Sequence, residues 1–214
     1  MPSIGRGGVY MSQAILFVVT GPSGSGKGTI MRSIIAAHKD LVKMATYTTR
    51  KPRPNEEGGF DYNFVTPEVF RAKIEQGEIA EYEQVYHDHY YGSPRFDANT
   101  GPDRLMELDF NGMYKYKKTT TRLVSIFIAP PSLDVIVERI MRRSREANLE
   151  RRIGNAYEQL EQAANYDYII INDSVEAACA EAIAIVRAER VKRDHARRAD
   201  LVRAMCAEKC APRR

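Results

Sequence analysis

The sequence predicts an α/β fold in which a parallel sheet lies between layers of helices. Short apolar runs, typical of buried strands, alternate with segments whose apolar residues repeat at helical spacing, and this alternation favours parallel strands joined by helices. One of these runs, "AILFVVTG", leads directly into a glycine-rich turn. The 214 residues suit one compact domain with a small insertion, and the 43% hydrophobic and 28% charged residues are ordinary for a globular protein.

The first pair of elements surrounds the stretch "GPSGSGKGT". A buried strand is expected over residues 14–21, and a helix with one apolar face is expected to about Ala37. A loop in this context points backbone N–H groups into one concavity, and Lys27 adds a full charge for the phosphates of a nucleotide. A tight turn alone would not require that lysine. We therefore expect a phosphate site made of Gly21, Pro22, Ser23, Gly24, Ser25, Gly26, Lys27, Gly28 and Thr29.

The metal contact of this loop departs from the strict motif. The motif places Ser or Thr after the lysine, where the hydroxyl binds Mg²⁺, but this chain has Gly28 there. Thr29 lies about 100° further round the helix and cannot take over that contact in place. Magnesium keeps several waters readily and accepts carboxylates. We expect Mg²⁺ to arrive with the nucleotide and to be held through water by Glu107 and Asp109, although both could be ordinary acids at the end of a strand.

Residues 45–99 change in character and predict a small, mainly β insertion. Prolines, paired glycines and alternating aromatic residues indicate short strands and turns. A helix is expected from Pro67 to Gly77, with Thr66 as its N-cap and with Phe70 and Ile74 on its inner face. The segment "EIAEYEQVYHDHYYGS" predicts a hairpin whose tip is His87-Asp88-His89.

The α/β alternation then resumes to the end of the domain. Buried strands are expected in "RLMELDF", "RLVSIFIAPPS" and "YDYIIIND". Ser132 is expected to cap a helix that runs to about Arg143, and an arginine-dense polar segment follows it. A further helix carries Ala156, Leu160 and Ala163/Ala164, and a long alanine-rich helix begins at Val175.

A second phosphate-binding feature lies in the insertion. Arg50 and Arg53 are three residues apart near Tyr62, and two such arginines can hold a phosphate bidentately. Alternatively, they pair with the acids Glu56, Glu57 and Asp61. Together with "GPSGSGK", the segments "TTRKPRPNEEGGFDYNFV", "EIAEYEQVYHDHYYGS", "ELDFNG", "IFIAPPS" and "YDYIIIND" resemble the guanylate kinase family from about residue 14 to 190.

The resemblance implies a three-layer P-loop NTPase fold with a parallel sheet, a small mixed-β GMP-binding insertion and an arginine-rich lid. It implies transfer of the γ-phosphoryl group of ATP to GMP or dGMP, giving ADP and GDP. The implied division is a flexible N-terminal tail (1–13), a nucleotide-binding core (14–44, 100–138 and 154–190), a GMP-binding subdomain (45–99), a lid (139–153) and a basic C-terminal helical tail (191–214).

The resemblance also assigns site residues. Arg50, Arg53, Tyr62 and Tyr91 would grip the GMP phosphate, while Thr46, Glu81 and Ser93 would read the base. The chemistry agrees, because guanine offers two adjacent donors to a carboxylate and an acceptor to hydroxyls, whereas adenine does not. Gly92 and Asp109 complete the GMP set, and Asn172 would touch the adenine of ATP. The implied catalytic cations are Lys27, Arg50, Arg139, Arg143 and Arg152, with Arg142, Arg145 and Arg151 close in register.

The chain departs from the family pattern at several places. Besides Gly28, Thr46 replaces a common serine, Asn55 a usual glycine and Glu107 a usual aspartate. The segment between Ser93 and Asp109 is about one helical turn short.

The same residues bear on other functions and partners. A catalytically silent interaction module could dispense with Lys27, and a kinase with another acceptor would not need Glu81, Thr46 and Ser93. The net charge of +4 arises within Arg187 to Arg203, where seven basic residues face three acids, so a solvated helix face is favoured over nucleic-acid binding. Cys179, Cys206 and Cys210 do not have zinc-site spacing and are expected to be reduced thiols. No signal peptide or membrane helix is expected, which predicts a cytoplasmic protein. The resemblance implies ATP and GMP as its partners.

Overall fold

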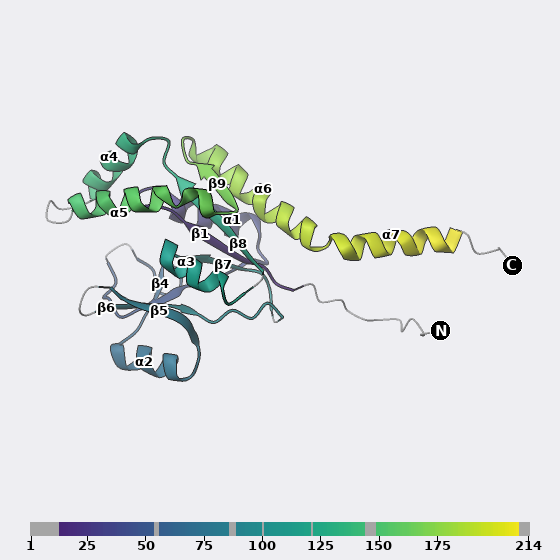
Figure 1. The fold of residues 1–214 in the computed structure, drawn as a ribbon, viewed down its shortest axis with the longest axis horizontal. Helices are drawn as coiled ribbons and strands as arrows, with labels where there is room; N and C mark the ends of the chain where they lie inside the picture. Colours follow the sequence, from purple (N-terminus) through teal and green to yellow (C-terminus); the bar gives the residue numbers. More distant parts are fainter. Residues whose placement is uncertain are drawn as a thin grey trace.

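The computed structural model describes residues 13–53, 56–85, 89–99, 101–120, 122–143 and 149–209. They form two sheets with helices packed around them (Figure 1). The larger sheet is entirely parallel and the smaller one is mixed, which confirms the predicted fold class. The expected tail over residues 1–12, the hairpin tip over residues 86–88 and the middle of the expected lid over residues 144–148 lie outside the described residues.

The parallel sheet has the strand order β2-β7-β1-β8-β9. Its central strand β1 is buried along its whole length and pairs with β7 on one side and β8 on the other. All the strands run the same way, so their carboxyl ends share one edge, and the glycine-rich loop follows β1 at that edge. The strands are β1 (Leu16–Thr20), β2 (Val42–Lys43), β7 (Arg104–Glu107), β8 (Leu123–Ala129) and β9 (Tyr168–Ile171). The two residues of β2 were not predicted, because so short a strand has no pattern to read.

Helices cover both faces of this sheet. On one face Phe17 and Val19 of β1 pack with α1 (Lys27–Ala37) and α6 (Val175–Arg193). On the other face Leu16 and Val18 pack with α3 (Phe110–Lys117) and with Leu160 of α5 (Leu149–Glu161). This alternation along one strand creates the three layers. Helix α4 (Leu133–Arg143) packs on α5 in a third cluster.

The smaller sheet belongs to the insertion and has the order β4-β3-β6-β5. Strand β3 (Thr46–Thr48) is parallel to β4 (Tyr62–Phe64) and antiparallel to β6 (His89–Pro94), which forms the predicted hairpin with β5 (Ile79–Val85). The predicted helix is α2 (Pro67–Glu75), and the hydroxyl of Thr66 accepts a hydrogen bond from the Val69 backbone N–H, as expected of an N-cap. Phe70 is fully buried under the sheet, whereas Ile74 is only partly buried. His89 was predicted at the hairpin tip but lies in β6, paired with Val85.

Helix α3 was missed in the sequence. Its N-cap is Asp109, whose Oδ1 accepts the backbone N–H of Gly112 at 2.7 Å. Asn111 and Gly112 are poor helix formers and hide the signal, although Met113 and Tyr116, three apart, carry the buried face. A smaller error concerns Ala163, which was placed in a helix with Leu160. Helix α5 ends at Glu161, and residues 163–165 form a short 3₁₀ turn.

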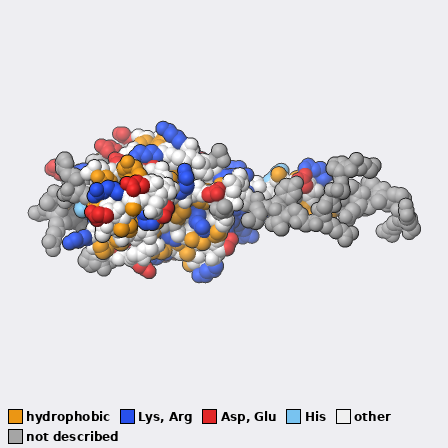
Figure 2. All heavy atoms as spheres, turned by 90° about the horizontal axis from the view of Figure 1, so that it is seen from below, with side chains coloured by type: hydrophobic (Ala, Val, Ile, Leu, Met, Phe, Trp, Pro, Cys, Tyr) orange, Lys and Arg blue, Asp and Glu red, His pale blue; other side chains and the backbone are white. Residues whose placement is uncertain are grey.

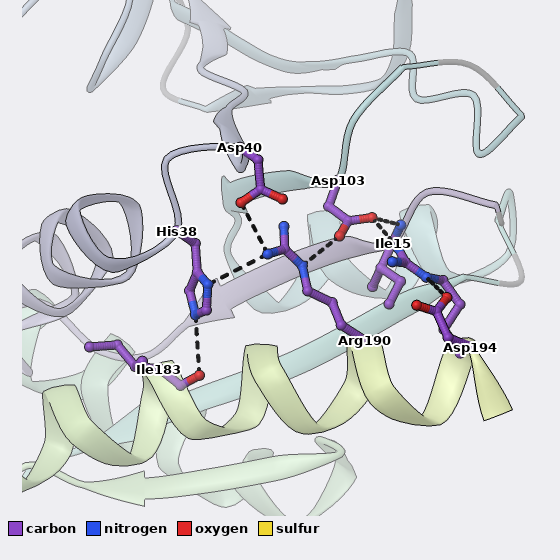
Figure 3. A network of polar contacts seen from close by, with 8 residues as sticks. Ile15, His38, Asp40, Asp103, Ile183, Arg190 and Asp194 are labelled. Atoms are coloured by element: carbon purple, nitrogen blue, oxygen red, sulfur yellow. Dashed lines mark hydrogen bonds and ion pairs between the residues drawn. The ribbon is translucent and has the colours of Figure 1, made fainter. Parts of the chain in front are cut away.

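A buried aspartate ties the opposite end of the sheet to the C-terminal helices (Figure 3). Asp103 accepts hydrogen bonds from the Ile15 backbone N–H at 2.8 Å, from Arg190 Nε at 2.8 Å and from an Arg193 guanidinium N–H at 2.7 Å. Arg190 also contacts Asp40 at 3.2 Å and lies 3.5 Å from Nδ1 of His38. These contacts fasten the end of α6 to the strands, so the long helix has a fixed position on the core.

Helix α7 (His195–Lys209) continues beyond this network and extends away from the body (Figure 1). On the face shown in Figure 2, charged side chains of both signs are interspersed. No helix within the described part of the chain is long and apolar enough to cross a membrane.

Candidate active site

The glycine-rich loop is fixed from behind by Asn172. Gly26 has φ +95°, and a Cβ there would lie 2.2 Å from Nδ2 of Asn172, so only glycine fits. The same Nδ2 donates to the Ser25 carbonyl at 2.6 Å. Asn172 was expected to touch the adenine of ATP. It is 2% exposed and contacts the backbone of the loop, so in this structure it supports the shape of the phosphate cradle.

Lys27 begins α1 and lies across the start of the loop. Its Nζ donates to the carbonyls of Gly21 at 2.7 Å and Pro22 at 3.1 Å. It also pairs with Oε1 of Glu107 at 3.5 Å. The lysine charge is thus held at the mouth of the cradle, between the loop and the end of β7.

The carboxylates expected near magnesium do not form a metal site by themselves. Glu107 is 43% exposed and pairs with Lys27, while one oxygen of Asp109 caps α3. Among the described residues there is no group of three or more acids, histidines or cysteines that could hold a metal. This donor set fits an ion that is coordinated mainly by nucleotide phosphates and water, with Glu107 and Asp109 able to accept hydrogen bonds from those waters.

Two of the expected lid arginines already touch the loop. Arg139 of α4 donates to the Gly24 carbonyl at 3.3 Å, and Arg152 of α5 donates to the Ser23 hydroxyl at 2.7 Å. Arg142, their rival in register, instead pairs with Glu138 one turn away on an exposed face. The side chains of Arg143 and Arg145 lie outside the described residues.

Arg50 is the centre of the expected acceptor-phosphate site. Its guanidinium forms a bidentate pair with Glu56, at 2.7 and 2.9 Å, and its Nε donates to the Tyr91 hydroxyl at 3.1 Å. The Arg50 contact holds the pKa of Glu56 below its usual range, and Glu56 raises the pKa of Arg50. The structure therefore contains the alternative predicted for Arg50, an ion pair with Glu56. This ion pair also orients the guanidinium.

Aromatic rings complete this site. The Arg50 guanidinium lies over the ring of Tyr62, 5.2 Å from its centroid, and the rings of Tyr62 and Tyr91 meet edge to face at 5.9 Å. Burial raises the pKa of the Tyr62 hydroxyl, so it stays a protonated donor at neutral pH. Arg53 differs, because its side chain is 71% exposed and only approaches Glu56 at 3.9 Å. The structure thus brings Arg50, Tyr62 and Tyr91 together and leaves Arg53 free to turn.

The residues expected to read the base lie on strands β3, β5 and β6 of the smaller sheet. Ser93 of β6 donates its hydroxyl to Oε1 of Glu81 on β5 at 2.5 Å, and these two residues are paired in the strand register. Gly92 beside them is required, since a Cβ would lie 2.8 Å from the Phe70 ring. Thr46 lies on β3, which pairs with β6. Among the described residues, Thr46 makes no hydrogen bond to Glu81.

Glu81 has an environment suited to a buried acceptor. Its side chain is 12% exposed, and Nζ of Lys115 on α3 lies 3.8 Å from Oε2. Burial raises the pKa of the Glu81 carboxyl, while the Ser93 hydrogen bond and the Lys115 charge partly oppose this rise. Lys115 was missed in the sequence because it belongs to the unpredicted helix α3.

The raised pKa of Glu81 predicts a pH-dependent affinity for a ligand that donates to this carboxylate. Only the ionised form can accept two hydrogen bonds, so affinity is full at high pH and falls once pH drops through the raised pKa, by about tenfold per pH unit. Titrating GMP calorimetrically from about pH 8 to about pH 4 checks this. The phosphate of GMP also takes up a proton near about pH 6, so the same titration of Glu81→Gln gives the part of the pH dependence that the ligand contributes. The same pH dependence of GMP affinity in the wild type and in Glu81→Gln would contradict it.

Comparisons with known proteins agree with this geometry. The sequence matches the guanylate kinase family profile over residues 13–189. A guanylate kinase from Caldanaerobacter subterraneus subsp. tengcongensis is 40% identical over 188 residues, which cover 85% of this chain and 91% of that protein. One from Clostridioides difficile is 36% identical, covering 86% and 92%.

A solved structure agrees as well. The crystal structure of guanylate kinase from Anaplasma phagocytophilum superimposes with a TM-score of 0.66 at 30% identity, covering 83% of this chain and 87% of that one. With the profile and the relatives each spanning most of the sequence, the chain belongs to the guanylate kinase family.

Proposed function

We propose that the protein is an ATP:GMP phosphotransferase that converts ATP and GMP into ADP and GDP. The observation that carries this proposal is the mostly buried Glu81 carboxylate, held by Ser93, in a chain that also has a phosphate cradle with Lys27. A buried acceptor pair of this kind matches the two adjacent donors of guanine, N1–H and N2–H₂, and would face the wrong groups of adenine. The family relatives are guanylate kinases, which supports the same substrates.

In the reaction, a phosphate oxygen of GMP attacks the γ-phosphorus of ATP. The bond from that phosphorus to the oxygen bridging to the β-phosphate breaks, so ADP leaves as GDP forms. There is little covalent chemistry for the protein to do, and its contribution is positioning and charge stabilisation. Lys27 and the loop N–H groups would hold the donor phosphates, and Arg50 with Tyr91 would hold the acceptor phosphate.

The arginines of α4 and α5 would complete the charge on the donor side. Arg139 and Arg152 contact Gly24 and Ser23 of the loop, so a small rotation of either side chain would bring a cation to the phosphate cradle. Magnesium bound to ATP would neutralise the β- and γ-phosphate oxygens. Glu107 and Asp109 would hold its waters. We extend the proposal to a cytoplasmic reaction.

The proposal is tested by measuring ADP formation from ATP and Mg²⁺ with GMP, dGMP, AMP, UMP and CMP as separate acceptors. GMP is expected to give the highest kcat/KM, exceeding that of AMP by about 10⁴-fold or more, because a site built to hydrogen-bond a base leaves its polar groups unpaired with the wrong one. Preference for AMP would contradict the role of Glu81. Inactivity with all five would favour the silent interaction module, and activity only with an acceptor outside this set would favour a related kinase.

A further inference from the structure

The loop between Glu56 and Tyr62 supports Arg50 from two sides. Glu56 at its start forms the bidentate pair with the guanidinium, and Tyr62 at its end supplies the ring beneath it. The loop is closed by its own hydrogen bonds, from the N–H groups of Phe60 and Asp61 to the Glu57 carbonyl and from Gly59 N–H to the Tyr62 carbonyl. Contacts that fix the position of this loop therefore also help to fix the orientation of the Arg50 guanidinium.

The ring of Phe60 connects the loop to the nucleotide-binding core. The guanidinium carbon of Arg32, on α1, lies over this ring at 4.9 Å from its centroid. Nζ of Lys43, on β2, lies over the same ring at 5.3 Å. Both cations come from the core and the ring comes from the insertion, so this pair of cation–π contacts joins the insertion to α1 and β2 of the core.

The two cations are placed close to the phosphate cradle. A Cβ on Gly28 would lie 3.5 Å from a guanidinium nitrogen of Arg32, so Arg32 passes beside the position where the strict motif has its hydroxyl. Burial lowers the pKa of the Lys43 amine, and the nearby carboxylates of Glu107 and Asp61 oppose that effect. Arg32 and Lys43 repel each other, and the electron-rich ring of Phe60 opposes both this repulsion and the cost of burying the Lys43 amine.

We propose that Arg32, Phe60 and Lys43 form a clamp that positions the loop between Glu56 and Tyr62 against helix α1. In this proposal Phe60 is a positioning residue for GMP. This inference rests on the proposed function for its kinetic consequence but not for its structural one. The clamp fixes Glu56 and Tyr62 and, through them, the direction of Arg50. Loosening it weakens the grip on the acceptor phosphate and leaves the donor cradle intact.

The first test measures kinetics. Phe60→Leu keeps an apolar side chain but removes both cation–π contacts, and two such contacts correspond to an increase in KM for GMP of about tenfold. The KM for ATP is expected to stay within about twofold, and Phe60→Tyr is expected to restore the KM for GMP. Lys43→Met is expected to raise KM by less and to add nothing in the Phe60→Leu background, since the contact is already lost.

A matched control removes a cation–π contact that lies wholly inside the insertion. Tyr47 lies under Nζ of Lys73 at 5.1 Å, and Tyr47→Leu is expected to leave both KM values near those of the wild type. Equal losses for ATP and GMP in Phe60→Leu, or a KM for GMP as low as that of the control, would overturn the clamp.

The second test needs no substrate and separates the clamp from the proposed function. Amide hydrogen exchange of Gly59, Phe60 and Asp61 is expected to become faster in Phe60→Leu, while the amides of β1 stay unchanged. Unchanged exchange in the loop would overturn the inference even if the protein phosphorylates GMP. Faster loop exchange in a protein that binds no GMP would support the clamp and refute the proposed function.

Discussion

Replacing Lys27 with Met is expected to lower kcat for GMP phosphorylation by about 10³-fold or more. Lys27 is the charged group placed at the mouth of the phosphate cradle, and its Nζ is already oriented by the carbonyls of Gly21 and Pro22. Methionine fills similar space without the charge. Charge on the donor phosphates would then lack its main side-chain cation, while the backbone N–H groups remain. Steady-state assays at saturating GMP measure the loss.

Lys39→Met is the matched control for Lys27→Met. Lys39→Met, at an exposed position just beyond α1, removes an equal charge and is expected to keep kcat within about twofold. In Lys27→Met, Glu107 loses its partner but is 43% exposed, so the variant is expected to unfold at nearly the wild-type temperature. A kcat within tenfold of the wild type in a folded Lys27→Met protein would show that the loop is not the donor site.

Local sequence patterns predicted the elements that place this lysine. The apolar run before Gly21 predicted strand β1, and the helical spacing of apolar residues after it predicted helix α1. Both could be predicted because burial of β1 and of one face of α1 leaves a local pattern of apolar residues in the sequence. The N-caps Thr66 and Ser132 were likewise readable, since each accepts from a backbone N–H three residues on. Helix α3 was not readable, because Asn111 and Gly112 disguise its first turn.

Contacts between segments far apart in the chain could not be predicted from the sequence. Asn172 reaches Ser25 across 147 positions, and no local pattern marks a strand-end asparagine as a support for a glycine loop. For Arg50 the ion-pair alternative is observed, and the phosphate clamp stays a prediction that this pairing does not exclude. Glu56 makes the ion pair and thereby orients the same arginine.

The register of the lid arginines shows the same limit. Arg139 and Arg142 both fit the sequence spacing, and they lie only about 60° apart around α4. Arg139 reaches Gly24 of the loop, whereas Arg142 pairs with Glu138 on the surface. Their contacts distinguish them, and which arginine reaches the loop depends on how α4 packs on α5.

Glu81→Gln is expected to lower kcat/KM for GMP by about 10²- to 10⁴-fold, since hydrogen bonds to a charged group contribute about 1.5–3 kcal/mol each and guanine would make two. The amide keeps the shape of the carboxylate but turns an N–H₂ group toward one of the guanine donors. Burial increases the cost, because Glu81 is 12% exposed and water cannot replace the lost acceptor. Initial rates over a range of GMP concentrations, at fixed saturating ATP, measure the change.

Glu83→Gln is the matched control for this variant. Glu83 lies two positions along β5, on the same side of the strand, and its carboxylate contacts the same Lys115 at 3.9 Å. It is 44% exposed and should leave kcat/KM for GMP within about twofold, because a screened surface charge contributes little. The part of the pH dependence of GMP affinity that comes from Glu81 should persist in Glu83→Gln and be lost in Glu81→Gln, which keeps only the transition of the GMP phosphate. Equal losses in the two variants would assign the effect to the field around Lys115. A pH dependence in Glu81→Gln equal to that of the wild type would show that another group reads the base.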